Sequence, residues 1–568
     1  GAEVVFSVDC TKLKDYFLPE KREFDCIYFN FPHCGRKAGV VKNRELLAHF
    51  FRSSAEVLTE EGEVHVALCN GQGGTPADQP RREWHNSWQI VAVAAGAGFI
   101  LSNVHPFKAE TISGYKCTGY RSQDKSFCVE GALNHVFRRS LPPPCFKPTI
   151  CKLQLEGQKV SFQVPQVLVD KINRGFLELN SNHPVRTVKE KLTAELSQAF
   201  LVQNLDHCLS LLHQGHLDSV CHSNIFWISL SPEETPSTEE MSNGLANAAF
   251  FPHVDFCKDT DEAGSVTVRE GCHISEQYYL RPSLLPDVQA VIQKGAFLPG
   301  TLHVLSGPVF RKCRIAPYSM PVFHEVVFAC AVTRGTENGC IQTLVNGIKT
   351  SVRSLHQTVS GLKLSIHLQE ATSFGTTELS DFAAFESQLS KIQYFICMDV
   401  DTPDSCEKSC CVGIIRAARY ELVSTELVVV FASLNLDLLT MLICGIADWR
   451  MLWTSDTRFL CQFSRELRLF KIFSLYPPSY EHDVSFWLPD GEQFNEVTFH
   501  TIARQVSGET VVSIQLIDSF QQPETGRKSL CYRLTFQSCD RALSRQEVAE
   551  MQLLFRKEIN QCLGVTLR

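Results

Sequence analysis

The sequence lacks an excess of positive charge. Its 568 residues include 54 Lys and Arg against 62 Asp and Glu, which gives a formal net charge of -8. This balance excludes a highly charged, nonspecific nucleic-acid binder, so any contact with RNA must come from local patches. With 44% hydrophobic and 20% charged residues the composition is that of an ordinary globular protein, and the length predicts roughly three to four domains.

The chain also lacks a convincing membrane span. Its longest apolar run, residues 427–446, is interrupted by Asn435 and Asp437. Polar side chains at the centre of such a run indicate a buried strand followed by a helix. No signal peptide is visible, and because the sequence begins with Gly1 rather than Met, we expect further residues upstream.

Metal-ligand spacing is missing as well. The 24 cysteines are scattered through apolar runs, which is typical of reduced core thiols. The densest group, Cys406, Cys410 and Cys411, has no second Cys or His pair at zinc-ligand spacing. We therefore expect no metal site. Reduced thiols also predict a cytoplasmic location, with a nuclear or nucleolar location as the alternative.

The first part of the chain shows a repeated strand-and-helix pattern. Apolar runs occupy residues 4–8, 24–29 and 63–68, and an amphipathic helix is expected over 43–58. Continuous apolar strands alternating with helices predict a parallel sheet covered on both faces. Ligands of such sheets bind outside the carboxyl ends of the strands, where Asp9 and the segment 30–33 lie.

The side chains at these strand ends suit a nucleoside-like cofactor and a base. The Asp9 carboxylate can accept hydrogen bonds from a ribose hydroxyl or an adenine amino group. The run Asn30-Phe31-Pro32-His33 predicts a stiff loop, because Pro32 has a fixed φ and restricts Phe31. The alternative is that Asp9 only caps the next helix and that the loop is only a turn.

Several segments of this first part resemble the rRNA uridine-N3 methyltransferases, over roughly residues 3–125. The resemblance is carried by Val8-Asp9-Cys10-Thr11-Lys12-Leu13, residues 24–35, Asn43-Arg44-Glu45-Leu46-Leu47, Gly62-Glu63-Val64-His65-Val66, Trp88 and Gly114-Tyr115-Lys116. That family opens with a strand and a Gly-Glu-Gly-type loop that cradles the cofactor, and this sequence does not contain them. The fold that the resemblance implies is thus a Rossmann-like methyltransferase sheet without its first strand.

The resemblance implies S-adenosyl-L-methionine as the cofactor and Asp9 as a residue that binds it. The implied catalytic group is Asn30, Phe31, Pro32 and His33, in which Asn30 and the Phe31 carbonyl position the base edge. His33 is the candidate proton acceptor because an imidazole titrates near neutral pH. Lys116 and Arg121 would hold RNA phosphates, although each could equally be a solvated surface charge.

Residues 145–472 resemble the catalytic core of phenylalanyl-tRNA synthetases, a class II antiparallel fold. The resemblance is carried by residues 182–191, 280–286, 309–311, 321–325 and 445–463. In that family a third motif supplies two glycines and an Arg for ATP, but here Ser433, Asn435 and Leu438 stand in their places. A leucine cannot make the bidentate phosphate contacts of a guanidinium. Cys313 also replaces an expected Asp, so we predict a degenerate core that is not a working synthetase, with Arg311 and Glu325 structural.

Residues 474–568 predict a ferredoxin-like split βαβ domain. The expected order is strand, helix, strand, strand, helix and short strand, at residues 484–488, 494–506, 511–520, 529–537, 545–563 and 565–568. Ser544 and Glu547 predict a capping box at the start of the long helix, and Gly564 predicts its end.

This last segment resembles the anticodon-binding domain that ends phenylalanyl-tRNA synthetases. Residues 476–477, 483–487, 516–518, 526–529, 531–536 and 543–544 carry the resemblance. It implies tRNA binding, for which the candidate cations are Arg504, Arg527, Lys528, Arg533 and Arg541. Because acidic residues outnumber basic ones in the segment, a structural or protein-binding role is the alternative.

The three parts together resemble a vertebrate family of ferredoxin-fold anticodon-binding domain-containing proteins. Their expected boundaries are 1–140, 145–472 and 474–568. The fold class expected is α/β and α+β multidomain. The function implied is an RNA-binding protein, acting on rRNA or tRNA, with an S-adenosylmethionine-dependent uridine-N3 methyltransferase-like domain. The alternative is a non-catalytic RNA-binding or scaffolding protein, and no protein partner is named by the sequence.

Overall fold

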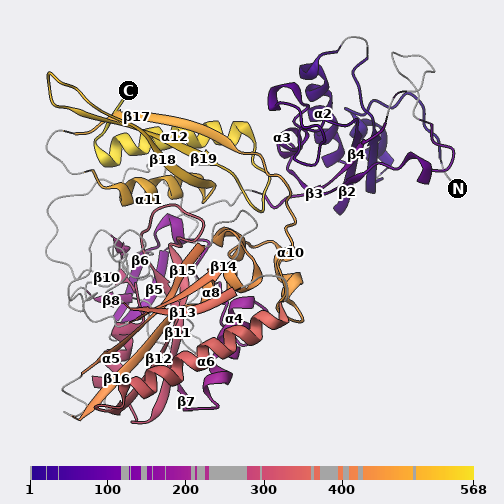
Figure 1. Ribbon diagram of the computed structural model, residues 1–568. Coiled ribbons are helices and arrows are strands. Elements are labelled where there is room, and N and C mark those ends of the chain that lie inside the picture. Colours follow the sequence, from indigo (N-terminus) through magenta and orange to yellow (C-terminus); the bar gives the residue numbers. More distant parts are fainter. Residues whose placement is uncertain are drawn as a thin grey trace, which may run out of the picture. The chain divides into compact units, whose positions relative to one another are not determined.

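In the computed structural model the chain forms two compact units (Figure 1). The first unit consists of Gly1–Pro144, Lys471–Phe494 and Ile502–Arg568. The second unit consists of Cys145–Phe470 and Asn495–Thr501. The residues that the structure describes are 3–20, 22–35, 38–116, 127, 129–142, 150–155, 158–172, 174–205, 211–213, 224–228, 278–293, 297–359, 364–370, 394–400, 408–419, 426–489 and 494–568. In this described part of the chain, no helix has the length and apolar character needed to cross a bilayer. Cys406 and Arg121 lie outside the described residues.

The N-terminal sheet is mixed. Its strands are β1 (Phe24–Asn30), β2 (Leu58–Leu68), β3 (Phe99–Pro106) and β4 (Leu133–Arg139), in the order β1-β2-β4-β3. β1 and β2 are parallel, whereas β4 is antiparallel to both β2 and β3. The expected all-parallel sheet is therefore wrong, because β4 pairs antiparallel with both of its neighbours and the apolar run of a single strand does not reveal its direction.

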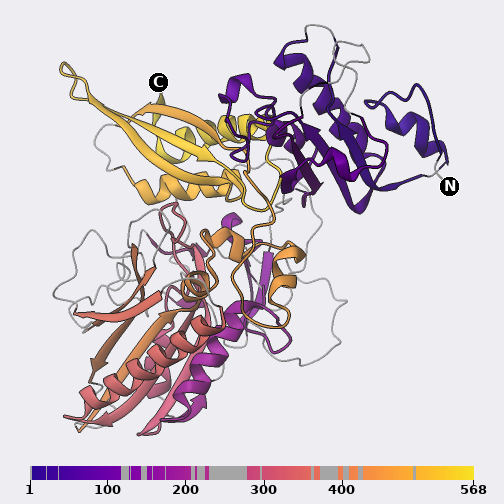
Figure 2. The same ribbon diagram turned by 45° about the vertical axis from the view of Figure 1, so that its right-hand side comes forward.

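One face of this sheet carries the core. The helices α2 (Val40–Ala55) and α3 (Ile90–Ala95) lie against it (Figure 2). They pack on it through a cluster that includes Phe51, Val64 and Phe137. The opposite face has polar side chains and Tyr28, which is 64% exposed, so the described residues do not cover both faces as expected. Residues 4–8 form no strand and are mostly exposed, which corrects that prediction. Shorter elements here are α1 (Leu13–Phe17), η1 (Leu18–Glu20), η2 (Trp84–Asn86) and η3 (Ala109–Thr111).

The C-terminal domain has the predicted ferredoxin-like order. Its antiparallel sheet β18-β19-β17-β20 is accompanied by two helices. The elements are β17 (Tyr480–Trp487), α11 (Glu496–Ser507), β18 (Val511–Gln521), β19 (Lys528–Phe536), α12 (Arg545–Leu563) and β20 (Thr566–Leu567). Ser544 and Glu547 form both hydrogen bonds of the capping box, and Gly564 ends α12 with φ +59°, so both local predictions are confirmed.

The second unit is built on a seven-stranded sheet, in the order β13-β14-β15-β16-β12-β11-β7. All its neighbours are antiparallel except β7 and β11. The strands are β7 (Leu201–Asn204), β11 (Thr301–Phe310), β12 (Val322–Thr333), β13 (Leu364–Glu370), β14 (Tyr394–Val400), β15 (Lys408–Ala418) and β16 (Leu427–Asn435). The predicted antiparallel core is thus confirmed, as is the buried strand followed by a helix at residues 427–446, which is β16 and α8 (Leu436–Cys444).

Helices and short elements complete this unit. The long helix α6 (Glu337–Thr358) runs beside α4 (Pro184–Leu196) and contacts β12 and β16 (Figure 1). The remaining elements are β5 (Ile150–Leu155), β6 (Gln158–Gln163), η5 (Gln166–Leu168), β8 (Leu211–His213), β9 (Trp227–Ile228), β10 (Tyr278–Leu280), α5 (Leu285–Gln293), α9 (Trp449–Leu452), α10 (Thr457–Leu460) and η10 (Cys461–Phe463).

Candidate functional site

The loop after β1 begins with an unusual backbone conformation. Asn30 is the last residue of β1, and Phe31 follows with φ +54°, in the left-handed region that a bulky residue rarely adopts. The Phe31 amide donates to the backbone oxygen of Ala67 in β2, at 2.9 Å. Its ring meets the rings of Phe107 and Phe127 edge-on, each at 5.0 Å between centroids. Strain of this kind persists where the surroundings hold it, and it concentrates at functional sites.

A buried asparagine holds the rest of this loop. Asn43 in α2 accepts a hydrogen bond from the Cys34 amide at 3.0 Å and donates to the Gly39 oxygen at 3.2 Å. His33 is exposed, and its Nδ1 accepts from the Gly35 amide at 3.0 Å. Because Nδ1 accepts this hydrogen bond, the neutral ring carries its proton on Nε2, and proton transfer to His33 would use Nδ1 in place of the Gly35 amide.

A glycine-rich loop follows the neighbouring strand β2. Gly71, Gly73 and Gly74 lie in it, and Gly71 and Gly74 both have φ +77°. The buried Asp78 carboxylate accepts from the Gly71 amide at 2.9 Å and from the Thr75 amide at 2.8 Å, which closes the loop. Because β1 and β2 are parallel and adjacent, the two loops leave the sheet at the same edge.

The glycine-rich loop rests on a buried histidine. His135 is fully buried, its Nδ1 lies 3.2 Å from the Val66 oxygen, and burial lowers the pKa of its ring. A Cβ built at Gly73 would lie 2.7 Å from His135 Nε2, so the ring and the loop are in close contact. The apolar run 63–68 predicted the strand before this loop but not the loop itself, although three glycines within four positions after a strand were the signal for it.

Asp9 lies on an exposed turn. Its Oδ1 accepts from the Thr11 amide at 2.9 Å and from the Thr11 hydroxyl at 2.7 Å. The Thr11 side-chain and backbone hydrogen bonds lower the pKa of Asp9. The first helix, α1, has Lys12 as its N-cap and no side-chain capping bond, so Asp9 does not cap it. Burial raises the pKa of the next residue, Cys10, and nearby Asp9 and Cys34 raise it further, which places this turn beside the loop after β1.

Lys116 is exposed at the end of an aromatic chain that leads to the same loop. The neighbouring Tyr115 ring lies 5.9 Å from Phe107, which in turn contacts Phe31. The structure therefore brings Asn30, Phe31, Pro32, His33 and Lys116 to one edge of the N-terminal sheet. Arg121 belongs to the residues that the structure does not describe.

The open face of the C-terminal sheet carries an aromatic and basic cluster. We call Trp487, Phe520, Arg527 and Arg568 the basic aromatic patch. The guanidiniums of Arg527 and Arg568 each lie 5.4 Å from the centroid of the Trp487 ring, and the Phe520 ring lies 6.1 Å from that of Trp487. Trp487 and Phe520 both lie beside Ser529 of β19, which aligns them across the sheet. Arg568, Trp487 and Phe520 were not among the predicted contacts.

The other predicted cations of this domain have different surroundings. Lys528 is exposed beside the patch. Arg504 is 2% exposed and pairs with Glu509 at 2.6 Å, a placement that does not favour contact with RNA. Arg533 makes two hydrogen bonds to Asp483, at 2.7 and 2.9 Å, which raise the pKa of its guanidinium. Arg541 donates to the backbone oxygen of Pro142.

In the synthetase-like core, the predicted structural residues are buried in internal hydrogen bonds. Arg311 is 3% exposed, and its Nε donates to the Pro282 oxygen at 2.7 Å. Glu325 is 1% exposed and accepts from the Leu284 amide at 2.6 Å and from the hydroxyl of Ser433. Ser433, which stands where the resemblance expects a glycine, thus joins β16 to Glu325 of β12.

Comparison with known proteins bears on each part of the chain. The family model described as rRNA (uridine-N3-)-methyltransferase BTM5-like matches residues 1–119. The model of the ferredoxin-fold anticodon binding domain matches residues 474–568. Both resemblances predicted from the sequence are thereby confirmed.

Similar full-length proteins are known from mammals. Ferredoxin-fold anticodon-binding domain-containing protein 1 of Homo sapiens is 48% identical over 582 residues, covering 100% of this chain and 91% of the human protein. The Mus musculus homolog is 47% identical with the same coverage. The chloroplastic/mitochondrial phenylalanine–tRNA ligase of Arabidopsis thaliana is 31% identical over 310 residues, covering 54% of this chain and 67% of that protein. The predicted relation to phenylalanyl-tRNA synthetases is thus confirmed.

Proposed function

The chain belongs to the family of ferredoxin-fold anticodon-binding domain-containing protein 1, and from this premise we propose that it methylates uridine N3 in RNA. The single observation that supports this activity most is the strained Phe31 loop, held beside the glycine-rich loop at one sheet edge. An alternative role, a non-catalytic RNA-binding or scaffolding protein, needs no such loop.

The proposed chemistry requires a base to be oriented and a proton to be removed. The Asn30 amide and the Phe31 carbonyl hold the uracil edge. His33 Nδ1 exchanges its hydrogen bond from the Gly35 amide for the N3 proton, which leaves the ring as an imidazolium. Lys116 binds a phosphate of the RNA backbone. S-adenosylmethionine, when bound, supplies an electrophilic methyl group. Asp9 fits it, because both hydrogen bonds from Thr11 go to Oδ1 and the residue is exposed, so Oδ2 can face a ribose hydroxyl.

The activity predicts a defined effect of Asn30→Ala. With rRNA as substrate and labelled S-adenosylmethionine, the wild-type chain should form 3-methyluridine. Asn30→Ala should lower the rate about tenfold or more, since a misplaced base loses the benefit of orientation. Mass spectrometry of digested RNA measures the product.

Asn103→Ala is the matched control, because Asn103 is an exposed asparagine in β3 of the same sheet, and it should leave the rate unchanged. If the wild-type protein binds RNA but forms no 3-methyluridine at saturating cofactor, the scaffold alternative holds. Cofactor titration by calorimetry then shows whether binding or chemistry has failed.

We further propose that the C-terminal domain binds RNA through few cations, since the protein is net acidic. The double variant Arg527→Ala/Lys528→Ala should flatten the dependence of log Kd on log salt by about two units at most, because each lost phosphate contact removes just under one unit. Titrations of the full chain with tRNA at several salt concentrations measure this slope.

The control is the double variant Arg545→Ala/Lys557→Ala, which removes one Arg and one Lys exposed on α12. Its slope should equal that of the wild type. Equal slopes for all three proteins would mean that the RNA contacts lie elsewhere in the chain. Undetectable binding by the wild type at low salt would favour a structural or protein-binding role for the domain.

A further inference from the structure

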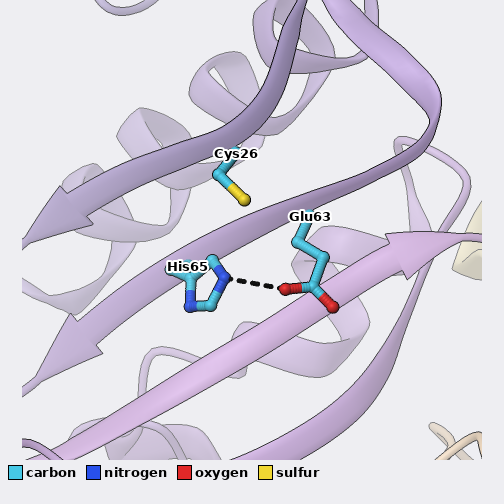
Figure 3. A group of neighbouring side chains, drawn as sticks. All are labelled: Cys26, Glu63 and His65. Atoms are coloured by element: carbon cyan, nitrogen blue, oxygen red, sulfur yellow. Dashed lines mark hydrogen bonds and ion pairs between the residues drawn. The ribbon is translucent and has the colours of Figure 1, made fainter.

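The polar face of the N-terminal sheet gathers three metal-ligand side chains. Cys26 of β1 and Glu63 and His65 of β2 present one ligand atom each, and these atoms lie within 4.8 Å of one another (Figure 3). The register of the strands causes this, since Cys26 is paired with Glu63, and Tyr28 with His65. In Figure 3 the Cys26 sulfur points toward the carboxylate and the imidazole from the neighbouring strand.

The pair on β2 is already close to coordination geometry. His65 Nε2 and Glu63 Oε2 are 3.1 Å apart. In a tetrahedral zinc site with bonds of about 2.0–2.3 Å, ligand atoms lie about 3.3–3.8 Å apart. The Cys26 side chain is exposed and can rotate. A rotation that moves its sulfur by about 1 Å therefore completes a set of three ligands.

Two neighbouring side chains hold these ligands in place. Arg138 donates from Nε and Nη2 to Glu63 Oε1, at 2.9 and 2.5 Å, which leaves Oε2 directed at His65. The Asn134 amide lies 3.1 Å from His65 Nδ1. When His65 binds a metal through Nε2, its Nδ1 carries the proton, and the rotated Asn134 amide accepts it through oxygen. Such outer partners orient ligands in known metal sites.

We propose that Cys26 Sγ, Glu63 Oε2 and His65 Nε2 bind one Zn²⁺, with a water molecule in the fourth position. A mixed thiolate, imidazole and carboxylate set suits zinc, whereas oxygen-only sets suit magnesium or calcium. On binding, the Cys26 thiol releases its proton to solvent and the His65 proton moves from Nε2 to Nδ1. This departs from the expectation of no metal site, because residues 26 and 63 meet only through strand pairing.

The site is separate from the proposed methyl-transfer loop. Cys26 precedes Asn30 by four positions in β1, or about 13 Å along a strand. The zinc site thus lies on the face of the sheet rather than at its carboxyl edge. The zinc proposal therefore does not depend on the proposed RNA methylation.

Zinc chloride titrated into the chelator-treated full chain tests the site. With 24 cysteines present, the comparison is between Cys26→Ser and Cys562→Ser, which removes another exposed thiol. Cys26→Ser should lose one equivalent of tight zinc, with affinity lowered at least a hundredfold, and Cys562→Ser should match the wild type. Equal stoichiometry and affinity in both variants would rule the site out.

Two further measurements use the same protein. Cobalt chloride should give a thiolate-to-cobalt charge-transfer band that disappears in Cys26→Ser and weakens in Glu63→Gln. In the wild-type chain, zinc should protect Cys26 from iodoacetamide while Cys34 and Cys562 stay reactive, as peptide mass spectrometry shows. This last test needs no variant to fold, and labelling of Cys26 at an unchanged rate would overturn the proposal.

Discussion

Replacement of Asp437 by alanine is expected to lower the free energy of unfolding of the synthetase-like core by about 3–5 kcal/mol, the usual result of removing one member of a buried pair. Asp437 is fully buried. Its Oδ1 accepts from the backbone amide and the Nδ1 of His324, at 3.0 and 2.9 Å, and its Oδ2 accepts from Trp453 Nε1 at 2.8 Å. Alanine would leave three buried donors without an acceptor, and each such group is costly.

Hydrogen exchange measured by mass spectrometry is the suitable readout, because a chain of two units does not unfold in one step. Peptides from β12 and α8 report the stability of this unit alone. Asp399→Ala is the control, since it removes a His-paired aspartate in the same sheet whose side chain is 32% exposed. It should cost less than about 1 kcal/mol. Equal effects of the two substitutions would show that the Asp437 network does not stabilise the core.

The same network joins the runs that resemble the second and third motifs of phenylalanyl-tRNA synthetases. Asp437 and Ser433 lie in the run that replaces the family's ATP-binding third motif, and their partners His324 and Glu325 lie in the second motif. These polar groups are satisfied by one another in the interior. Leu438, at the place of the phosphate-binding Arg, is 4% exposed and belongs to the hydrophobic core. The physical role of the motif residues is therefore to hold β12, β16 and α8 together.

The parts of the fold that the sequence predicted well are those determined by local interactions. The Ser544 capping box and the left-handed Gly564 mark the ends of α12 within three or four residues of sequence. The strand followed by a helix at residues 427–446 was predicted as well, and the structure adds a local signal for it, since Asn435 caps α8 by accepting a hydrogen bond from the Leu438 amide at 2.9 Å. Signals of this kind do not depend on which distant segment packs nearby.

The directions of the N-terminal strands depend on distant pairing and could not be predicted in the same way. The apolar content of β4 is compatible with either direction, and only its pairing with both β2 and β3 makes it antiparallel. Residues 4–8 are apolar, yet they find no strand partner among the described residues and stay exposed. A hydrophobic pattern indicates that a segment is buried. The partner strand of that segment and its direction in the sheet depend on the whole sheet.

The candidate sites also divide into those formed by neighbouring residues in sequence and those formed by the pairing of distant strands. The Asn30–His33 loop could be predicted because its residues are contiguous. The basic aromatic patch could not, because Trp487, Phe520 and Arg568 come from three strands or their ends and meet through register. The Cys26, Glu63 and His65 group also depends on register, and its members have no metal-ligand spacing in sequence.

Substitution of Trp487 by alanine should weaken binding of single-stranded RNA loops by about 1–3 kcal/mol, the usual value of one base stacked on an aromatic ring. This corresponds to roughly a 5- to 150-fold rise in Kd. The guanidiniums of Arg527 and Arg568 each lie 5.4 Å from the centroid of this ring. An unstacked base can therefore lie against the aromatic cluster while the two cations face its phosphates.

The loss of affinity in different Trp487 variants distinguishes base stacking on the ring from charge contacts to RNA phosphates. Trp487→Phe keeps an aromatic face and should lose less affinity than Trp487→Ala, with the salt slope unchanged in both, since neither removes a cation. Trp84→Ala, which removes a tryptophan 43% exposed on η2, is the control and should bind like the wild type. Titrations of the full chain against a tRNA anticodon stem-loop give these values. If Trp487→Ala binds as tightly as the wild type while Arg527→Ala/Lys528→Ala does not, the patch holds phosphates only, and the aromatic rings serve the fold.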